Sequence, residues 1–427
     1  MRMRVLLWFA LAQVCLAGRL YHVEHYDVLV KPDLAAKRID GEVTVKLRSL
    51  VEKLDTVVFD SGDLTIEEVS EDKTALGHSE ANKQLTIALK KPAAKGEIRS
   101  IRVKYHGTPT RGIRFFPDEI YTAFSTSEWM VCNNDPSDLA AYSLRVIVPM
   151  GMRVAASGLA KRETDYNGAR VSDWEQAVPI PSFVFGFSAG KFTEANEKEG
   201  LITLRYLGKN HTQDQLRRIF RVTGAALRYY RSRSAVAYAQ STYTQVLAQG
   251  SIEQEAAGFT LLSASYGEQV LKKPDDTWLI AHELAHQWWG IGVACESWTD
   301  FWLNEGMATF MANSFLETQY GKERYTAEME RSRQRYEEAK SAGKDRPLSF
   351  TGWKTPQEAS GPIPYHKGAW FLHLLRQKIG EQKFWKGIEI YTGMYFGKSV
   401  KSSDFQGVME AISGQDLKAF FDEWVYR

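Results

Sequence analysis

Two histidines and two glutamates in the second half of the chain have the types and spacing of a metal-dependent hydrolytic site. His282, Glu283 and His286 form the pattern H-E-x-x-H within a run of helical periodicity that starts near Trp278. Residues four apart share one face of a helix, so both imidazoles can bind one ion, whereas Glu283 projects about a quarter-turn away. Glu305 follows after 18 intervening residues and opens a second helical run. This spacing predicts one Zn2+ ion held by His282, His286 and Glu305.

The same residues suggest the chemistry of such a site. Three protein ligands leave one coordination position open, as in catalytic rather than structural zinc sites. Zinc lowers the pKa of water and polarises a carbonyl group, and Glu283 would act as the general base that passes a proton to the leaving amine. Tyr365, in a short segment that ends at Trp370, could donate its phenol to the developing oxyanion.

The elements that must position these residues fall into two parts. From Tyr21 to Phe192 the pattern is strand-like, with turn residues about every ten positions. Strands are expected at residues 41–47, 101–105, 144–149 and 183–187. From Gln213 onward apolar residues recur at helical spacing. We predict an antiparallel β-sandwich-like domain over residues 18–193 and a mostly helical catalytic domain over residues 194–427.

The N-terminal 17 residues have the outline of a signal peptide. Arg2 and Arg4 precede an apolar run that ends at Ala17, which is short for a membrane span. The alternative is a buried N-terminal strand or helix. We expect residues 1–17 to be removed and the protein to be exported, periplasmic or extracellular, with no membrane span in the mature chain. Cys132 and Cys295 would then remain, too few for a disulfide framework.

Composition limits the class of partner. The 427 residues suffice for two or three domains, and 44% hydrophobic with 25% charged residues is typical of soluble globular proteins. Lys and Arg number 54 against 52 Asp and Glu, a formal charge of +2. This balance lacks the basic excess of a nucleic-acid footprint, so nucleic acid is not an expected partner.

Three segments, in the same order, resemble a known family: His282–Gly290, Trp302–Gly306 and Tyr365–Gly368. They are similar to the zinc aminopeptidases of the aminopeptidase N and leukotriene-A hydrolase family, which are gluzincin metallopeptidases. Cys132–Pro136 resembles the P-C-x-D-E-P motif of that family's N-terminal domain. The resemblance implies a thermolysin-like catalytic domain behind a saddle-shaped β-domain, and peptides as substrates. It also implies His282, His286 and Glu305 as ligands, Glu283 as base and Tyr365 as transition-state donor.

The family's amine-recognition motif, G-A-M-E-N, is altered. Its nearest counterpart is Ser251–Phe259, where one alignment places Glu255 on the motif's glutamate and another favours Glu253. We prefer Glu255. In an extended strand the two carboxylates project to one face, where they would bind a substrate's α-ammonium. The alternative is a pair of solvated strand glutamates.

Two further departures bear on function. Ala312 stands where many relatives carry an acidic residue behind the metal, so Asp300 or Glu317 is a candidate for that supporting role. The chain also ends without the large helical C-terminal domain common in the family, which suggests a more open cleft. We predict an aminopeptidase that hydrolyses the N-terminal peptide bond. The alternatives are a zinc endopeptidase with an open cleft and a non-catalytic binding protein on the same fold.

Overall fold

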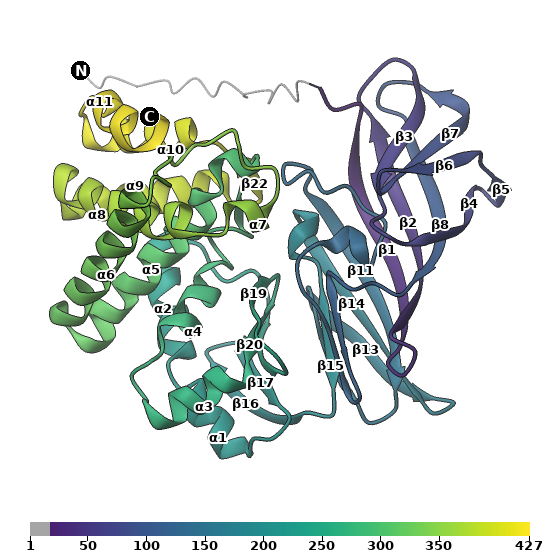
Figure 1. The fold of residues 1–427 in the computed structure, drawn as a ribbon, viewed down its shortest axis with the longest axis horizontal. Helices are drawn as coiled ribbons and strands as arrows, with labels where there is room; N and C mark the ends of the chain where they lie inside the picture. The colour runs from purple at the N-terminus through teal and green to yellow at the C-terminus, as the bar shows by residue number, and fades with distance from the viewer. Residues whose placement is uncertain (1–17) are drawn as a thin grey trace, which may run out of the picture.

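A computed structural model describes residues 18–427, and the predicted signal peptide lies outside the described residues (Figure 1). Strands fill the N-terminal part of the chain and helices dominate the C-terminal part. The predicted succession of a strand-rich region and a helical catalytic region is confirmed.

The largest layer of the N-terminal part is an eight-stranded sheet with the order β13-β14-β11-β1-β2-β8-β4-β5. Its strands are β1 Tyr21–Asp33, β2 Arg38–Ser49, β4 Thr65–Glu71, β5 Thr74–Ala75, β8 Ile98–Gly107, β11 Ala140–Pro149, β13 Leu159–Tyr166 and β14 Ala169–Ile180. Val43 and Val45 pair with Val103 and Ile101 across β2 and β8, and all four are buried. Period-two alternation thus places the apolar face of these strands in the core.

Two smaller sheets complete the N-terminal part, in the orders β3-β7-β6 and β12-β15-β10-β9. Their strands are β3 Leu54–Asp60, β6 His78–Ala81, β7 Gln84–Ala93, β9 Ile113–Phe116, β10 Glu119–Thr122, β12 Arg153–Ala156 and β15 Phe187–Gly190. All three sheets contribute to one hydrophobic core. One pair differs from the antiparallel prediction, because β1 lies parallel to β11. The long stretch of chain between these two strands supplies the crossover that parallel neighbours need.

The segment 183–187 was predicted as a strand, and this is wrong for most of its length. Residues Ser182–Val184 form a 3-10 turn, η2, and β15 begins only at Phe187. The Ser182 hydroxyl donates a 2.6 Å hydrogen bond to the carbonyl oxygen of Asn133, which holds the turn. Every residue of the segment is buried. Its apolar run therefore reflects burial on all sides rather than a strand.

The C-terminal part begins with a five-stranded sheet in the order β16-β17-β18-β20-β19. Its strands are β16 Thr193–Glu199, β17 Ile202–Gly208, β18 Thr242–Ala248, β19 Glu253–Ala256 and β20 Phe259–Ser263. The strands β18 to β20 interrupt the helical region expected from Gln213 onward. β18 lies parallel to both of its neighbours and is buried almost throughout, so its sequence lacks the period-two alternation of a half-exposed strand.

Helices pack around this sheet and account for most of the remaining chain (Figure 1). They are α1 Gln213–Ile219, α2 Thr223–Ser234, α3 Ala264–Lys272, α4 Trp278–Ala285, α5 Trp302–Tyr320, α6 Lys322–Ser341, α7 Pro356–Ala359, α8 Gly368–Ile379, α9 Glu381–Tyr395, α10 Ser402–Ser413 and α11 Lys418–Phe421. Two short strands, β21 Val293–Cys295 and β22 Lys398–Val400, pair in parallel. Within residues 18–427, no helix combines the length and the apolar character needed to cross a membrane.

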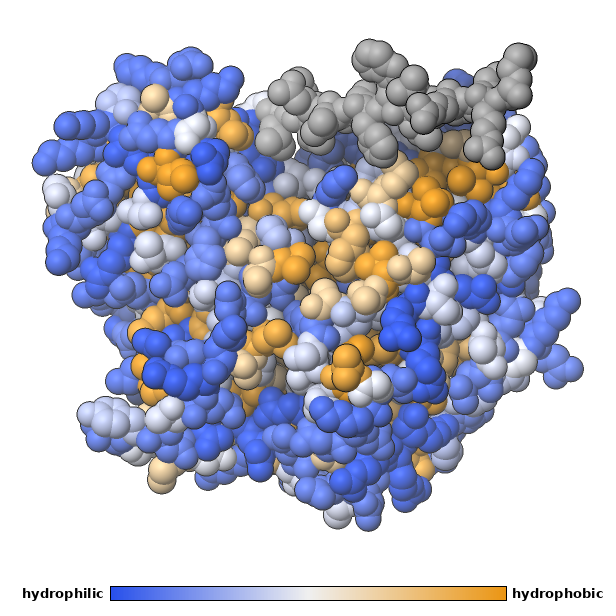
Figure 2. Space-filling model, turned by 180° about the vertical axis from the view of Figure 1, so that it is seen from behind, coloured by the Kyte–Doolittle hydropathy of each residue, from blue (hydrophilic) through white to orange (hydrophobic). Residues whose placement is uncertain are grey.

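The described residues have a mainly hydrophilic outline and no disulfide between Cys132 and Cys295. Seen from behind, hydrophilic side chains cover most of the outline, whereas hydrophobic ones gather toward the middle of that face (Figure 2). Cys132 and Cys295 are both free and buried. Packing rather than a disulfide between these two residues therefore stabilises the described structure.

Hydrogen bonds join the two parts of the chain beside β19. Glu119 of β10 accepts from the backbone N–H of Gln249 at 2.9 Å, and Tyr121 donates to the carbonyl oxygen of Gln249 at 2.7 Å. The backbone N–H of Phe124 donates to Oε1 of Gln254, within β19, at 2.9 Å. The N-terminal part therefore holds the strand that carries Glu253 and Glu255.

Candidate active site

The three predicted ligands meet where α4 and α5 pack together. His282 lies on α4, His286 directly follows its last residue, and Glu305 lies in the first turn of α5. The two histidine Nε2 atoms are 3.1 Å apart, and each is 3.4 Å from Oε2 of Glu305. Ligand atoms about 2.1 Å from a tetrahedral zinc ion lie about 3.4 Å from one another. The donor set therefore has the size and chemistry of a zinc site.

Carboxylate oxygens without hydrogen-bond partners lie in and beside this ligand set. Among the described residues, Oε1 of Glu255 and Oε2 of both Glu283 and Glu305 are buried without a hydrogen-bond partner. Burial raises the pKa of Glu255 to about 7 and that of Glu283 well above its usual range. Burial alone would lower the pKa of His286, but the carboxylates of Glu305 and Glu255 outweigh it and raise that pKa to about 10. The cluster thus favours a positive charge at its centre, which a metal ion supplies.

Neutral groups contact the Nδ1 atoms of the two histidine ligands. Nδ1 of His286 is 3.1 Å from the carbonyl oxygen of Trp289. Gly290 has φ +126°, and a Cβ there would lie 2.9 Å from the same Nδ1, so glycine lets the chain turn back onto the ring. Nδ1 of His282 is 3.5 Å from Oγ1 of Thr309. Such contacts fix which nitrogen of each histidine faces the metal.

Asp300 and Glu317, the acidic residues that the sequence suggested as support for the ligands, are not among these contacts. Asp300 accepts a 2.6 Å hydrogen bond from the Ser402 hydroxyl, and Glu317 pairs with Arg376 at 3.1 Å. Both candidates for a supporting role are therefore wrong. The Trp289 carbonyl and the Thr309 hydroxyl occupy the positions next to the rings instead, and Trp278 stacks on His282 with ring centroids 4.7 Å apart.

Tyr365 lies on a π-helical turn, η4 (Ile363–Lys367), that touches α5 directly behind Glu305. A Cβ added to Gly306 would lie 2.8 Å from the carbonyl oxygen of Pro364 and 2.9 Å from the Cα of Gly368, so the two backbones are in direct contact. This contact places the Tyr365 ring 5.9 Å from the His282 ring. Burial raises the pKa of Tyr365 well above its usual range, so the phenol keeps its proton for donation.

Lys367 anchors the same turn from the other side. Its buried ammonium donates to Oδ1 of Asp345 at 2.9 Å and to the carbonyl oxygen of Arg346 at 2.6 Å. The Tyr-x-Lys-Gly segment thus combines a phenol, an anchor and a glycine that allows close backbone contact.

Glu253 and Glu255 lie on β19 and both line the same cavity as the ligands. Glu255 is 4% exposed, whereas Glu253 is exposed to solvent. The alternative interpretation, a pair of solvated strand glutamates, therefore describes Glu253 and not Glu255. Gln287, next to His286, accepts from the N–H of Gly258 and donates to the carbonyl oxygen of Ala256, both at 2.9 Å. These bonds tie the end of β19 to the end of α4.

The cavity over these groups has a volume of about 540 Å³, within the range of ligand pockets. Its lining includes residues for which the sequence analysis assigned no role: Phe124, Trp278, Leu279, Arg335 and His366. Phe124 comes from the N-terminal part and has φ 46°, a strained backbone for a bulky residue. No local motif points to Phe124 or Arg335, because only the folded chain brings them to the ligands. His366 adjoins Tyr365, and the π-helical turn directs it into the cavity.

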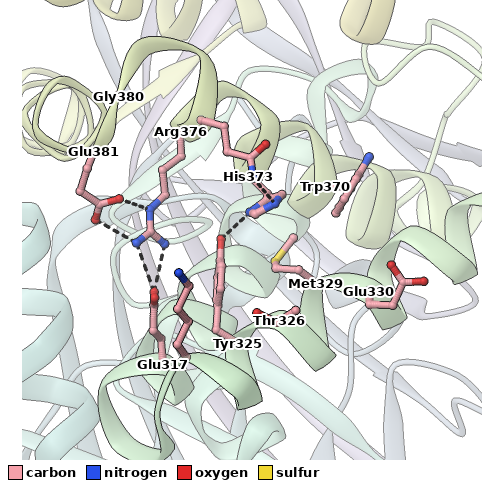
Figure 3. Close-up of a pocket in the computed structure, with 12 residues that line it drawn as sticks. Glu317, Tyr325, Thr326, Met329, Glu330, Trp370, His373, Arg376, Gly380 and Glu381 are labelled. Carbon is pink, nitrogen blue, oxygen red and sulfur yellow. Dashed lines mark hydrogen bonds and ion pairs between the residues drawn. The ribbon is translucent and has the colours of Figure 1, made fainter.

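A second cavity of about 550 Å³ lies among the last turn of α5 and helices α6, α8 and α9 (Figure 3). Arg376 points between Glu317 and Glu381 and pairs with both. A 2.8 Å hydrogen bond links the Tyr325 hydroxyl to Nδ1 of His373. The central polar groups of this cavity already have partners, unlike the carboxylates around His282 and His286.

Comparisons with known proteins agree with this geometry. The model of the Peptidase M1 N-terminal domain matches residues 22–184, and that of the Peptidase family M1 domain matches residues 223–424. Rat glutamyl aminopeptidase is 26% identical over 77% of this chain and 35% of its own length. Probable aminopeptidase 1 of Sulfurisphaera tokodaii is 26% identical over 95% of this chain and 53% of its own length. The chain thus spans about half, or less, of these two curated relatives.

One solved structure covers the chain almost completely. It is a mutant M1 zinc metallopeptidase from Deinococcus radiodurans bound to a Tyr-Ser-Ala substrate, with a TM-score of 0.82 at 24% identity. The match covers 95% of this chain and 94% of that chain, so the fold is the same throughout. The two family models together cover both parts of the chain, and the predicted resemblance is confirmed. The chain belongs to peptidase family M1.

Proposed function

We propose that this protein is a zinc-dependent aminopeptidase that hydrolyses the N-terminal peptide bond of peptides. One observation carries the proposal. A carboxylate oxygen of Glu255, one of Glu283 and a ring nitrogen of His286 lie within 4.8 Å of one another, and His286 belongs equally to the ligand set with His282 and Glu305. A substrate ammonium held by Glu255 would therefore place the first peptide bond next to the metal ligands and the base.

Each residue of the site would have a separate role in the reaction. Zinc, held by His282, His286 and Glu305, would supply the Lewis acid that polarises the carbonyl and makes water more acidic. The free Oε2 of Glu283 would accept the proton of the attacking water and deliver it to the leaving amine. The Tyr365 phenol, which stays protonated, would donate a hydrogen bond to the oxygen that gains charge. Glu255, with Glu253 at the rim, would hold the ammonium by charge-assisted hydrogen bonds.

The relatives support this assignment by their names. Glutamyl and leucyl aminopeptidases and a leukotriene A-4 hydrolase homologue are among them. Structures of M1 zinc metallopeptidase mutants have been solved with a Tyr-Ser-Ala substrate, with L-tryptophan and with L-arginine. Export to the periplasm or the outside of the cell is a further part of the proposal, and Arg2, Arg4 and the apolar run that follows them support it.

The test compares aminoacyl chromogenic substrates with their N-acetylated forms. We expect hydrolysis of the free amines only, abolished by a chelator and restored by zinc. Glu283→Gln should retain zinc, measured by metal analysis, yet lose most turnover. Glu255→Ala should weaken hydrolysis of free amines far more than any residual cleavage of blocked peptides. Efficient cleavage of acetylated substrates would instead favour an endopeptidase, and zinc binding without any hydrolysis would favour a binding protein.

A further inference from the structure

Arg335 on α6 is a cation without a close partner at the edge of the active-site cavity. Within residues 18–427 its guanidinium takes part in a single ion pair, a 3.6 Å contact with the exposed Glu338, and in no hydrogen bond. The other arginines of α6 are tightly paired. Arg324 and Arg331 lie 2.7 and 2.9 Å from the buried Glu328, and Arg333 lies 2.7 Å from Glu330.

His366 lines the same wall of the cavity and also lacks a partner. Its Nδ1 is buried without a hydrogen bond to any described residue. Burial lowers the pKa of His366 to about 4, so the ring is neutral at neutral pH and Arg335 supplies the charge. The turn η4, which carries His366, packs against α6, which carries Arg335. One wall of the cavity thus presents a weakly paired cation beside the neutral ring of His366.

The opposite wall has the reverse charge. Glu253 and Glu255 lie on β19, which packs against α4. Figure 1 shows β19 and α6 on opposite sides of α4. The metal ligands and Glu283 lie on α4 and at the start of α5, between these walls. The cavity therefore runs from an acidic wall, past the reaction centre, to a basic wall.

A short peptide has the complementary charges, with an ammonium at its first residue and a carboxylate at its last. We propose that Arg335 binds the carboxylate of the leaving part of the substrate. The enzyme would then prefer peptides short enough for their free C-terminus to lie at this wall. The proposal rests on the proposed aminopeptidase activity, which orients the peptide. Arginine suits this role because two N–H groups of its planar guanidinium can bind both oxygens of one carboxylate.

The kinetic test uses three substrates: Leu-Gly-Gly with a free carboxylate, the same peptide as its amide, and a second peptide, Leu-Asp-Gly amide. Because Arg335 is 61% exposed, we expect kcat/KM to favour the free acid over the amide by about two- to fivefold, the range of an exposed ion pair. Arg335→Gln should bring that ratio close to one, and Arg335→Lys should retain part of it. Arg333→Gln removes the same charge from another face of α6 and should keep the full ratio.

Two results would overturn the proposal. The first is an acid-to-amide ratio of one in the unmodified enzyme, or a ratio that Arg335→Gln and Arg333→Gln change equally. The second is an Arg335-dependent preference for Leu-Asp-Gly amide over Leu-Gly-Gly amide, without a preference for the free acid of Leu-Gly-Gly over its amide. That result would assign the arginine to an acidic side chain rather than to the C-terminus.

A binding measurement separates this proposal from the proposed activity. Calorimetry of zinc-loaded Glu283→Gln protein with the acid and the amide of Leu-Gly-Gly gives the ratio of dissociation constants without turnover. Tighter binding of the acid that disappears in the Glu283→Gln, Arg335→Gln double variant supports the carboxylate site even if no peptide is cleaved. Equal binding of both forms refutes the site even if the enzyme is an active aminopeptidase.

Discussion

Gly306→Ala tests whether the contact between α5 and η4 sets the position of Tyr365, the proposed transition-state donor. The new methyl group would meet three backbone atoms of Pro364 and Gly368 at 2.8, 2.9 and 3.1 Å. Backbone cannot rotate away as a side chain can, so η4 must retreat by about 0.6 Å to restore ordinary contact distances. Overpacking of this kind costs about 1–3 kcal/mol. Alanine itself favours a helix over glycine by about 1 kcal/mol, which offsets part of that cost.

Gly407→Ala is the matched control. Gly407 lies within α10, and a Cβ there would meet no atom within 4 Å. This variant should be stabilised by about 0.5–1 kcal/mol, because alanine reduces the freedom of the unfolded chain. We therefore expect Gly306→Ala to be less stable than Gly407→Ala by about 2 kcal/mol in urea unfolding followed by tryptophan fluorescence.

The kinetic consequence is separate from the loss of stability. A misplacement of about 1 Å can cost about 100-fold in rate, so a retreat of about 0.6 Å should lower kcat about tenfold. The zinc content should stay near one ion per chain, since the side chain of Glu305 itself is unchanged. Equal stability of the two alanine variants would refute the steric argument. A destabilised Gly306→Ala variant with unchanged kcat would show that this contact does not position Tyr365.

The metal and the half-buried His373 give two further predictions. Zinc at 1,000 times its dissociation constant should raise the free energy of unfolding of the chelated protein by about 4 kcal/mol, and Glu305→Gln should lose most of this gain in thermal unfolding. Burial, with the charge of Arg376, lowers the pKa of His373 from 6.5 to about 4. Between these pH values the unfolded chain binds the proton more readily, so the free energy of unfolding should fall as the pH is lowered from about 6.5 to 4. His373→Gln should show a smaller fall between pH 7 and pH 5 in urea unfolding, and an unchanged slope would contradict the assignment.

The sequence predicted the parts of the site that local spacing determines. His282 and His286 share a helix face by their separation alone, and the helical run predicted at Glu305 is α5. The π-helical turn at Tyr365 was not predictable in this way. It depends on the backbone contact of Gly306 with Gly368, between residues far apart in the sequence. Arg335 lies in a helix whose charges are typical of a solvated face, and only the fold shows that one of them borders the cavity.

Charge balance supports the proposal that this arrangement favours removal of the first residue over internal cleavage. Three buried carboxylates, those of Glu255, Glu283 and Glu305, have an oxygen without a hydrogen-bond partner among the described residues. A divalent zinc ion compensates two negative charges and a substrate ammonium compensates the third. A peptide with a blocked amine would leave one buried carboxylate unpaired, at a cost of several kcal/mol unless it takes up a proton. Glu253 lies outside this balance because solvent reaches it. The discrimination between free and acetylated substrates should therefore depend on Glu255 and much less on Glu253. The ratio of kcat/KM for the free substrate to kcat/KM for the acetylated one should fall strongly in Glu255→Gln and much less in Glu253→Gln.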